Sequence, residues 1–565
     1  MFKRRSFSLV GMGLLLISTL LSVFIPYIVK NLIDNTELHF FGFNNYLLLA
    51  AAYLGQVIFS SLGYFMFAKI TMTNVYDLRQ KIMHNLLVGR YSFFDHNKIE
   101  QVPSHLTTNI KTYEHYVQVI PQFISGLFLI VISIIFLFSL DWKLSAVMFI
   151  SLPLLGIIVT PLSAFSGKLS NYLQKSSALY TEKIINCLQN ILYIKTLNAE
   201  SQIEENIDQE NKELKNIAIK SGGVDAIANP LVFLLFLIIV SLIFVYGGKR
   251  VQSGEITIGV LISFLLYLLQ LINPIANTSN FFMAKSKWKT NKAELEKYLT
   301  LESETTNEGK EELTEIKNLS FCNLSFAYEH TAVLDNLSCE IPIGSKIAVV
   351  GPSGSGKSTL YKLLLRLYEP DSGKILLNAQ ELNSFSKKSI RRHIALVPQE
   401  NSIIGSSLSD FLNLGQEHKI SDAQLIDTLN TVGLAAELNL NTENIAGYDF
   451  GLAAKNLSVG QKQRLMIAKA LLKEASIYLL DESTASVDSE LETLIFETLL
   501  KFKPDKTIIS IAHRLSTVKY ADTIIFLEEG KISGIGTHNE LYAQHEHYRH
   551  FIDLQLIKTE TEQAG

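Results

Sequence analysis

Residues 346–360 read KIAVVGPSGSGKSTL, and this stretch decides the fold of the second half of the chain. An apolar strand pattern comes first, and the run from Gly351 to Ser358 then matches G-x-x-x-x-G-K-[ST]. Glycines let backbone N–H groups wrap around phosphates at the start of a helix, where the helix dipole also favours anions. We expect Lys357 to reach the outer phosphates and the Ser358 hydroxyl to bind Mg²⁺. The stretch therefore predicts an α/β nucleotide-binding domain.

Two carboxylates and a histidine follow later apolar strands. The segment SIYLLDE (476–482) ends in Asp481 and Glu482, and strand ends are where α/β sheets bind their ligands. We expect Asp481 to hold the water shell of the metal and Glu482 to polarise an attacking water. His513 comes just after the apolar run of KTIISIAHRL (506–515). A lone histidine is more often structural than catalytic, but this strand-end position favours a contact with a γ-phosphate.

The segment LSVGQKQR (457–464) opens a long helical run, RLMIAKALLKE. Ser and Gly at the start of a helix are ordinary capping residues, so one interpretation is a helix N-terminus with no further role. The other interpretation is half of a phosphate site whose remaining half lies elsewhere. The segment by itself leaves both interpretations open.

The composition divides the chain into two parts. Its 565 residues are enough for two or three domains, and the mean hydropathy of +0.22 is high for a soluble protein. Apolar residues form long uncharged blocks before about residue 285 and short strand-sized runs afterwards, which indicates a membrane part followed by a soluble part. A net charge of −4 does not favour a nucleic-acid partner, which would require a concentrated basic face. Three cysteines without paired or metal-type spacing are expected to be reduced thiols: Cys187, Cys322 and Cys339.

Six stretches lack Asp, Glu, Lys and Arg for long enough to cross a bilayer core, which takes about 20 apolar residues. They lie near Ser6–Val29, Tyr46–Ala68, Val117–Leu140, Leu144–Gly167, Asn229–Gly248 and Thr257–Ala284. The first follows KRR as a signal peptide would, but its length, the lack of an A-x-A-like site and the five further spans favour a retained helix. Spans without ionisable residues argue against an ion-coupled transporter. Their polar residues either line a cavity or bond neighbouring helices; these residues include Gln118, Gln122, Asn273, Asn277 and Asn280.

The distribution of positive charge predicts the orientation. Basic residues at 3–5 precede the first span, which assigns the N-terminus to the cytoplasm. The segments 69–116 and 168–228 then fall inside, and their length and helical composition predict membrane helices that continue into the cytoplasm, turn and return. Lys249 and Arg250 go against the rule, because they fall outside. We expect both termini and the nucleotide-binding domain to be cytoplasmic.

These patterns predict three regions. Residues 1–300 form an α-helical polytopic membrane domain with six helices and two long cytoplasmic hairpins. Residues 301–317 form a linker that begins with the charged run LESETTNEGKEELT. Residues 318–565 form an α/β P-loop NTPase domain.

The ordered set GPSGSGKST, LVPQE, LSVGQKQR, IYLLDE, STASVDSE and IAHRLST resembles the nucleotide-binding domain of ATP-binding-cassette (ABC) transporters. The segments GGKRVQSGEITIGVLISFLLYLLQLINP, DWKLSAVMF and YIKTLNAE are similar to parts of bacterial multidrug half-transporters. The resemblance covers nearly the whole chain. It implies a type I exporter fold with a fused C-terminal ATPase, and ATP and Mg²⁺ as cofactors.

The resemblance also implies roles for individual residues. Tyr328 would stack on adenine, Gln399 would contact Mg²⁺ and sense the γ-phosphate, and Asp488 would cross to the partner domain. In this family ATP is bound between two domains, so Ser458 and the Gly460 N–H of one chain would complete the phosphate site of the other. The implied nucleotide-binding residues are Tyr328, Gly351, Pro352, Ser353, Gly354, Ser355, Gly356, Lys357, Ser358, Thr359, Gln399, Ser458, Gly460, Gln461, Asp481 and Asp488. The implied metal-binding residues are Ser358, Gln399 and Asp481, and the implied catalytic residues are Glu482 and His513.

The chain departs from the family pattern in three places. Val459 stands where the family has Gly, and we expect the phosphate contacts of Ser458 and Gly460 to survive, with looser or slower closure. The run AGYDFGLAAKNLS (446–458) is longer than the family's Gly- and Glu-rich loop and differs from it. Near residue 100 the chain has residues that differ from those of its relatives in the region that couples the ATPase to the membrane helices: Glu100, Pro103 and His105.

The function that the resemblance implies is ATP-driven export of an amphipathic or hydrophobic substrate by alternating access. A multidrug exporter is the first interpretation, and a lipid flippase or a dedicated peptide or bacteriocin exporter shares its motifs. An ATP-gated channel or regulator is a further alternative, which the intact Glu482 disfavours. A homodimer is the simpler assembly, and a heterodimer with a degenerate partner is the alternative. The expected location is the cytoplasmic membrane.

Overall fold

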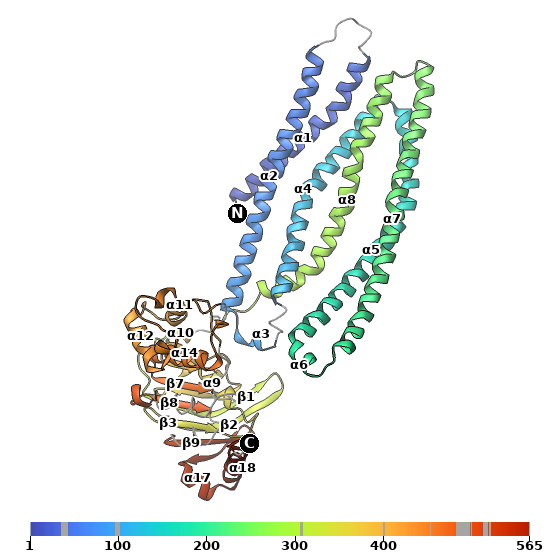
Figure 1. Ribbon diagram of the computed structural model, residues 1–565. Coiled ribbons are helices and arrows are strands. Elements are labelled where there is room, and N and C mark those ends of the chain that lie inside the picture. Colours follow the sequence, from blue (N-terminus) through green and yellow to red (C-terminus); the bar gives the residue numbers. More distant parts are fainter. Residues whose placement is uncertain are drawn as a thin grey trace. The chain divides into compact units, whose positions relative to one another are not determined.

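The computed structural model describes residues 2–34, 43–96, 102–304, 309–398, 402–451, 454–481, 498, 500–511, 518 and 521–563. The chain forms two compact units, one from Met1–Met83 and Gln101–Leu299 and the other from His84–Glu100 and Thr300–Gly565. The first unit is helical and the second contains all the strands of the described residues. Figure 1 shows both units.

Long continuous helices build the first unit. They are α1 (Phe2–Asp34), α2 (Phe43–Val88), α4 (Val102–Leu140), α5 (Trp142–Gln189), α7 (Glu200–Gln252) and α8 (Ile258–Leu299), with the short α6 (Ile191–Thr196) between α5 and α7. The helices α2, α5 and α7 run without a break through spans and the adjoining segments that the sequence assigned to the cytoplasm. The helices are therefore as continuous as predicted (Figure 1), and their extension into the cytoplasm stays a prediction.

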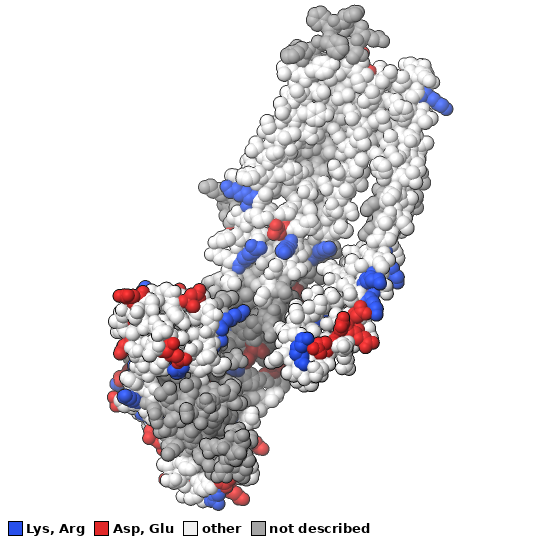
Figure 2. Space-filling view, viewed as in Figure 1, with Lys and Arg blue, Asp and Glu red and all other residues white. Residues whose placement is uncertain are grey.

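Five helical segments of the described residues are long and apolar enough to cross a membrane. They are Phe7–Asp34, Tyr46–Val88, Leu106–Leu140, Phe233–Gln252 and Ile258–Leu299. Large apolar side chains on these helices are exposed, among them Leu54, Phe65 and Ile135, and lipid would cover such surface. Figure 2 shows that a long stretch of the visible face of this unit lacks charged side chains. The remaining predicted span, 144–167, falls in α5, but side chains at 151–160 lie outside the described part, so this span stays a prediction.

Side chains of α8 donate hydrogen bonds to backbone carbonyls of α1. Pro26 interrupts α1, and because proline has no N–H, the carbonyl of Ser22 loses its helical partner. The Nε2 of Gln270 donates to that carbonyl at 3.0 Å, and the Tyr267 hydroxyl donates to Val23 O at 2.7 Å. Because unpaired backbone groups are costly in lipid, these bonds stabilise the proline-containing turn of α1.

A buried ion pair holds Arg250, one of the two basic residues that go against the charge rule. The Arg250 guanidinium, in a residue only 8% exposed, donates to Asp141 and to Glu255. Asp141 also caps α5 by accepting from Leu144 N at 2.7 Å. Two carboxylates therefore compensate the positive charge that the sequence placed on the outer side.

Two sheets form the centre of the second unit. An antiparallel sheet has the order β2-β1-β4-β5 and contains β1 (Asn318–Tyr328), β2 (Thr331–Pro342), β4 (Ser372–Leu377) and β5 (Gln380–Glu381). A six-stranded sheet has the order β10-β9-β3-β8-β7-β6 and contains β3 (Lys346–Val350), β6 (Ile394–Val397), β7 (Ile477–Asp481), β8 (Thr507–Ile511), β9 (Thr523–Glu528) and β10 (Lys531–Gly536). In the second sheet β6, β7, β8, β3 and β9 are mutually parallel. Parallel strands with both faces buried confirm the predicted α/β class.

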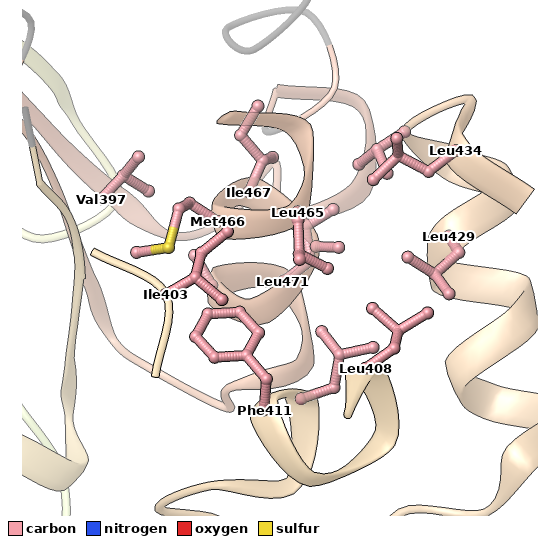
Figure 3. Close-up of a cluster of buried hydrophobic side chains, with 14 of the residues drawn as sticks. Val397, Ile403, Leu408, Phe411, Leu429, Leu434, Leu465, Met466, Ile467 and Leu471 are labelled. Atoms are coloured by element: carbon pink, nitrogen blue, oxygen red, sulfur yellow. The ribbon is translucent and has the colours of Figure 1, made fainter. Parts of the chain in front are cut away.

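Short helices cover these sheets. They are α3 (Tyr91–His96), α9 (Lys357–Leu364), α10 (Lys387–Arg392), α11 (Leu408–Asn413), α12 (Asp422–Thr431), α13 (Leu434–Glu437), α14 (Val459–Leu472), α17 (His538–Gln544) and α18 (Glu546–Gln563). In Figure 3, Leu465 of α14 lies among apolar side chains of neighbouring helices, including Leu429 of α12 and Leu434 of α13. This packing holds α14 rigidly in its domain.

The short helix α3 packs within the second unit. Its Asp95 carboxylate accepts hydrogen bonds from Lys362 at 3.1 Å and from the Tyr368 hydroxyl at 2.7 Å. Just before α3, Gly89 forms a β-bridge with Ser303. The described residues between α2 and α4, 89–96, are therefore held by contacts within the second unit.

Candidate nucleotide-binding site

The phosphate loop runs from the end of β3 to the start of α9, as the sequence predicts. Gly356 caps α9 with a φ of 98°, and a Cβ there would lie 2.6 Å from Leu334 Cδ2 and 3.0 Å from Val333 O. At Gly351 a Cβ would lie 2.1 Å from Leu527 O. Only glycine fits at both positions, because the neighbouring strands come too close for a side chain.

Lys357, at the first position of α9, is buried at 5% exposure. Its Nζ donates to Gly351 O at 2.9 Å, to Pro352 O at 2.7 Å and to Ser355 Oγ at 3.4 Å. Burial lowers the pKa of Lys357 to about 8, although the nearby Asp481 carboxylate acts in the opposite direction. Here the Lys357 ammonium group bonds to neutral carbonyl oxygens. Negatively charged phosphate oxygens in the same place would bind it more strongly.

Asp481 ends β7 at the same sheet edge where β3 ends, because β7, β8 and β3 are parallel neighbours. The side chain is 8% exposed, and its Oδ1 is buried without a hydrogen-bond partner among the described residues. Burial raises the pKa of Asp481, whereas a hydrogen bond with Tyr361 and the charge of Lys357 lower it. A buried carboxylate oxygen without a partner beside the phosphate loop fits a role in holding hydrated Mg²⁺.

Tyr328 lies at the end of β1, next to α9. Its ring makes an edge contact with Tyr368, with 5.2 Å between centroids, and Lys362 Nζ lies 5.4 Å from the ring centroid. The Thr359 hydroxyl bonds to the Tyr328 hydroxyl at 3.4 Å. The predicted adenine-stacking residue therefore lies beside the phosphate loop, with its ring orientation set by aromatic and cationic neighbours.

The signature segment forms the capped start of α14. The Ser458 Oγ accepts from Gln461 N at 3.2 Å, and Gln461 Oε1 accepts from Ser458 N at 2.8 Å, which completes a capping box. Val459 is 59% exposed, and nothing lies within 4 Å of a Cβ built at Gly460. Val459 is therefore compatible with the capped helix start, and the first turn of α14 is open to a ligand.

The hydrogen bonds of the described residues divide the predicted site into two groups. Lys357, Asp481, Tyr328 and Thr359 lie together at the phosphate loop. Ser458 and Gln461 bond to each other on α14. Four predicted residues lie outside the described part of the chain and stay predictions: Gln399, Glu482, Asp488 and His513.

Two residues that the sequence interpretation missed belong to these groups. Tyr361 bonds to Asp481; it lies four residues after Lys357, on the same face of α9, so helical spacing could have indicated it. Glu437 accepts a hydrogen bond from Gln461 Nε2 at 2.7 Å. The two residues are 24 positions apart, and no local pattern in the sequence connects them.

Two family models match the chain. The ABC transporter transmembrane region matches residues 8–275, and the ABC transporter model matches residues 334–485. These matches include the predicted membrane spans up to residue 275 and the phosphate loop.

Similar proteins and a solved structure extend the match over nearly the whole chain. A multidrug resistance ABC transporter ATP-binding and permease protein of Lactococcus lactis subsp. cremoris is 30% identical over 98% of this chain and 94% of its own. An ATP-dependent lipid A-core flippase of Syntrophus aciditrophicus is 29% identical over 85% of this chain and 80% of its own. The structure of a bacterial Atm1-family ABC exporter with ATP bound has a TM-score of 0.79 at 22% identity, with 97% of each chain covered. That likeness concerns the fold.

Proposed function

Because this chain belongs to the ABC transporters, with a membrane-spanning region fused to an ATPase domain, we propose that it exports amphipathic or hydrophobic compounds in a multidrug manner. ATP hydrolysis drives the transport. The observation that carries this proposal is a buried Lys357 near Asp481, whose Oδ1 has no hydrogen-bond partner among the described residues, in a chain whose helices can cross a membrane.

The residues at the phosphate loop have separate tasks in ATP binding. Lys357 exchanges its bonds to the loop carbonyls for bonds to the outer phosphates, which also favours its protonated form. The Tyr328 ring stacks on the adenine, and the Ser358 hydroxyl and Asp481 hold Mg²⁺ and its water. When bound, the Mg²⁺ ion neutralises charge on the phosphates. Glu482 follows Asp481 directly and polarises the attacking water.

A second copy of the chain completes each site. The Ser458 Oγ accepts from Gln461 N, and its hydroxyl also has one hydrogen to donate. Ser458 and the Gly460 N–H of one copy contact the γ-phosphate held by the phosphate loop of the other. ATP binding therefore closes two ATPase domains on each other, and hydrolysis releases them. A homodimer supplies two such sites, since this chain has every residue they need.

The proposed location is the cytoplasmic membrane, with the ATPase domain and both termini inside. The basic residues before the first span support this orientation. Arg250, one of the two basic residues that go against this orientation, is paired with Asp141 and Glu255.

Export of a lipid is the second candidate function. Relatives named as lipid A-core flippases support it, and apolar helices without charges suit a lipid as well as a drug. The two candidates differ in which compound accelerates ATP hydrolysis.

The test is ATP hydrolysis by the full-length protein in lipid nanodiscs, with amphipathic drugs, lipids and peptides added one at a time. We expect the wild type to hydrolyse ATP, Glu482→Gln to lose nearly all of this activity, and some drugs to stimulate the wild type. The half-buried Glu381, which lies outside the predicted site residues, supplies the matched control Glu381→Gln. Stimulation only by lipids would favour the flippase. Equal, negligible turnover of the wild type and Glu482→Gln would contradict an active exporter.

A further inference from the structure

Glu437 holds the side chain of Gln461 in a defined orientation. The Nε2 of Gln461 donates to Glu437 Oε1 at 2.7 Å, while Arg464, one turn further along α14, donates to Glu437 Oε2. The hydrogen bond from Gln461 and the charge of Arg464 keep the pKa of Glu437 below its usual value. The group is therefore a carboxylate near neutral pH.

A carboxylate can only accept hydrogen bonds, so it selects one of the two ends of the Gln461 amide. The NH₂ end must face Glu437, which leaves the carbonyl end for the backbone N–H of Ser458. The Ser458 Oγ accepts from the backbone N–H of Gln461, so the two residues hold each other through one side-chain bond in each direction. A flipped amide would direct its NH₂ group at the Ser458 N–H and break the capping box.

The short helix α13 presents Glu437 rigidly. Leu434 of α13 is buried in the same apolar cluster as Leu465 of α14 (Figure 3). Ala435 of α13 belongs to this cluster too. Arg464 Nη1 also donates to Gly433 O, at 3.4 Å, at the start of α13. The acidic end of α13 therefore cannot move away from the first turns of α14 without breaking apolar contacts.

We propose that Glu437, which lies outside every ATPase motif of the chain, is a positioning residue for the phosphate-contacting turn of α14. It acts through Gln461, whose carbonyl oxygen accepts from the backbone N–H of Ser458, and so fixes the position of Ser458 at the start of α14. This inference rests on the proposed role of Ser458 at the γ-phosphate of a second copy. The phosphate loop and Tyr328 still bind the nucleotide without Glu437, so the catalytic rate depends on it more than ATP binding does.

The first test compares Glu437→Ala with Glu381→Ala in the full-length protein in nanodiscs. Glu381 is a matched control, because its side chain is 39% exposed against 41% for Glu437 and it also pairs with a cation, Lys374. We expect Glu437→Ala to lower kcat about five- to tenfold with less than about a twofold change in KM for ATP. Glu437→Gln keeps one acceptor and should give an intermediate kcat. Glu381→Ala should match the wild type.

A double-mutant cycle with Gln461→Ala separates positioning from a structural effect. If Glu437 acts through Gln461, then Glu437→Ala should have no further effect on kcat in the Gln461→Ala background. A role through the Arg464 ion pair alone would give the same fold-change in both backgrounds, and that result would overturn the proposal. So would a kcat of Glu437→Ala and Glu437→Gln equal to that of Glu381→Ala.

Hydrogen exchange of the nucleotide-free protein tests the geometry without relying on hydrolysis. We expect Glu437→Ala to increase exchange at residues 458–462 about tenfold, while Glu381→Ala leaves it unchanged. Unchanged exchange at this turn in Glu437→Ala would overturn the proposal. If the wild type shows no turnover, the proposed function fails, and exchange alone decides whether Glu437 positions α14. Should Glu437→Ala not fold, Glu437→Gln takes its place in both measurements.

Discussion

Gly356 has two physical requirements that only glycine meets. Its φ of 98° lies in the left-handed region, and a Cβ would also collide with Leu334 and Val333 of β2. Gly354, two residues earlier, has a similar φ of 83°, but nothing lies within 4 Å of its Cβ position. A substitution at Gly354 would therefore add backbone strain alone, whereas one at Gly356 would add both backbone strain and a steric collision.

We predict that Gly356→Ala weakens ATP binding at least about tenfold and lowers stability by about 1–3 kcal/mol. Gly354→Ala should have the smaller effect on both, because it adds strain without a collision. Nucleotide titration and thermal unfolding of the full-length protein in detergent measure the two effects. Equal losses in the two variants would show that the close approach of β2 does not matter.

Tyr361 shows how a residue outside the motifs contributes at this scale. Its hydroxyl bonds to Asp481, and burial together with that carboxylate raises the pKa of the tyrosine. The phenol therefore stays protonated and donates to one carboxylate oxygen, which leaves Oδ1 without a partner among the described residues.

Among the elements, α1 and α8 depend on each other through the broken turn at Pro26. The proline removes the N–H that would bond to Ser22 O, and Gln270 of α8 supplies a donor in its place. Gln270 Oε1 is itself buried without a partner among the described residues. The side chain is therefore held by its donor end alone.

We predict a strong coupling between Pro26→Ala and Gln270→Leu. Gln270→Leu alone should destabilise the protein by about 1–2 kcal/mol, because it leaves a carbonyl unpaired in the apolar interior. In the Pro26→Ala background the restored backbone N–H bonds to Ser22 O. Adding Gln270→Leu there should leave the free energy of unfolding nearly unchanged. Thermal unfolding in nanodiscs measures all four variants.

Gln118 provides the control for this cycle. It bonds to Glu114 on its own helix at 3.2 Å, so Gln118→Leu should show no coupling with Pro26→Ala. If the effects of Pro26→Ala and Gln270→Leu simply added, Gln270 would not be the replacement donor for the proline-containing turn.

At the scale of the whole molecule, the separation of the site residues into two groups leads to a prediction about the dimer. Lys357 belongs to the phosphate loop and Ser458 to α14, and the hydrogen bonds recorded for the described residues do not connect these groups. We predict that a mixed dimer of Lys357→Met and Ser458→Ala chains retains up to about half of the wild-type ATPase rate, because one of its two sites is then intact.

Differently tagged chains, co-expressed and purified through both tags, allow this measurement. Each variant alone forms dimers in which both sites are defective, and these should be inactive. Mixed dimers as inactive as the single variants would mean that each site is built within one chain.

The sequence alone determined the class of each half of the protein and the position of its phosphate loop, and it predicted five of the helices that are long and apolar enough to cross a membrane. These features depend on local order: the run of apolar residues, the glycines of a turn and the residues that cap a helix. From the same local signals the chain was predicted to have long continuous helices, an α/β ATPase and a capped α14, and the structure has all three.

Only the tertiary structure decided which distant residues meet. In the structure Glu437 accepts a hydrogen bond from Gln461, and Gln270 donates to the carbonyl of Ser22. Arg250 forms ion pairs with Asp141 and Glu255. The tertiary structure also grouped residues 84–100 with the nucleotide-binding domain. Each of these contacts depends on the packing of whole elements, because a side chain finds its partner through the fold and not through its neighbours in the chain.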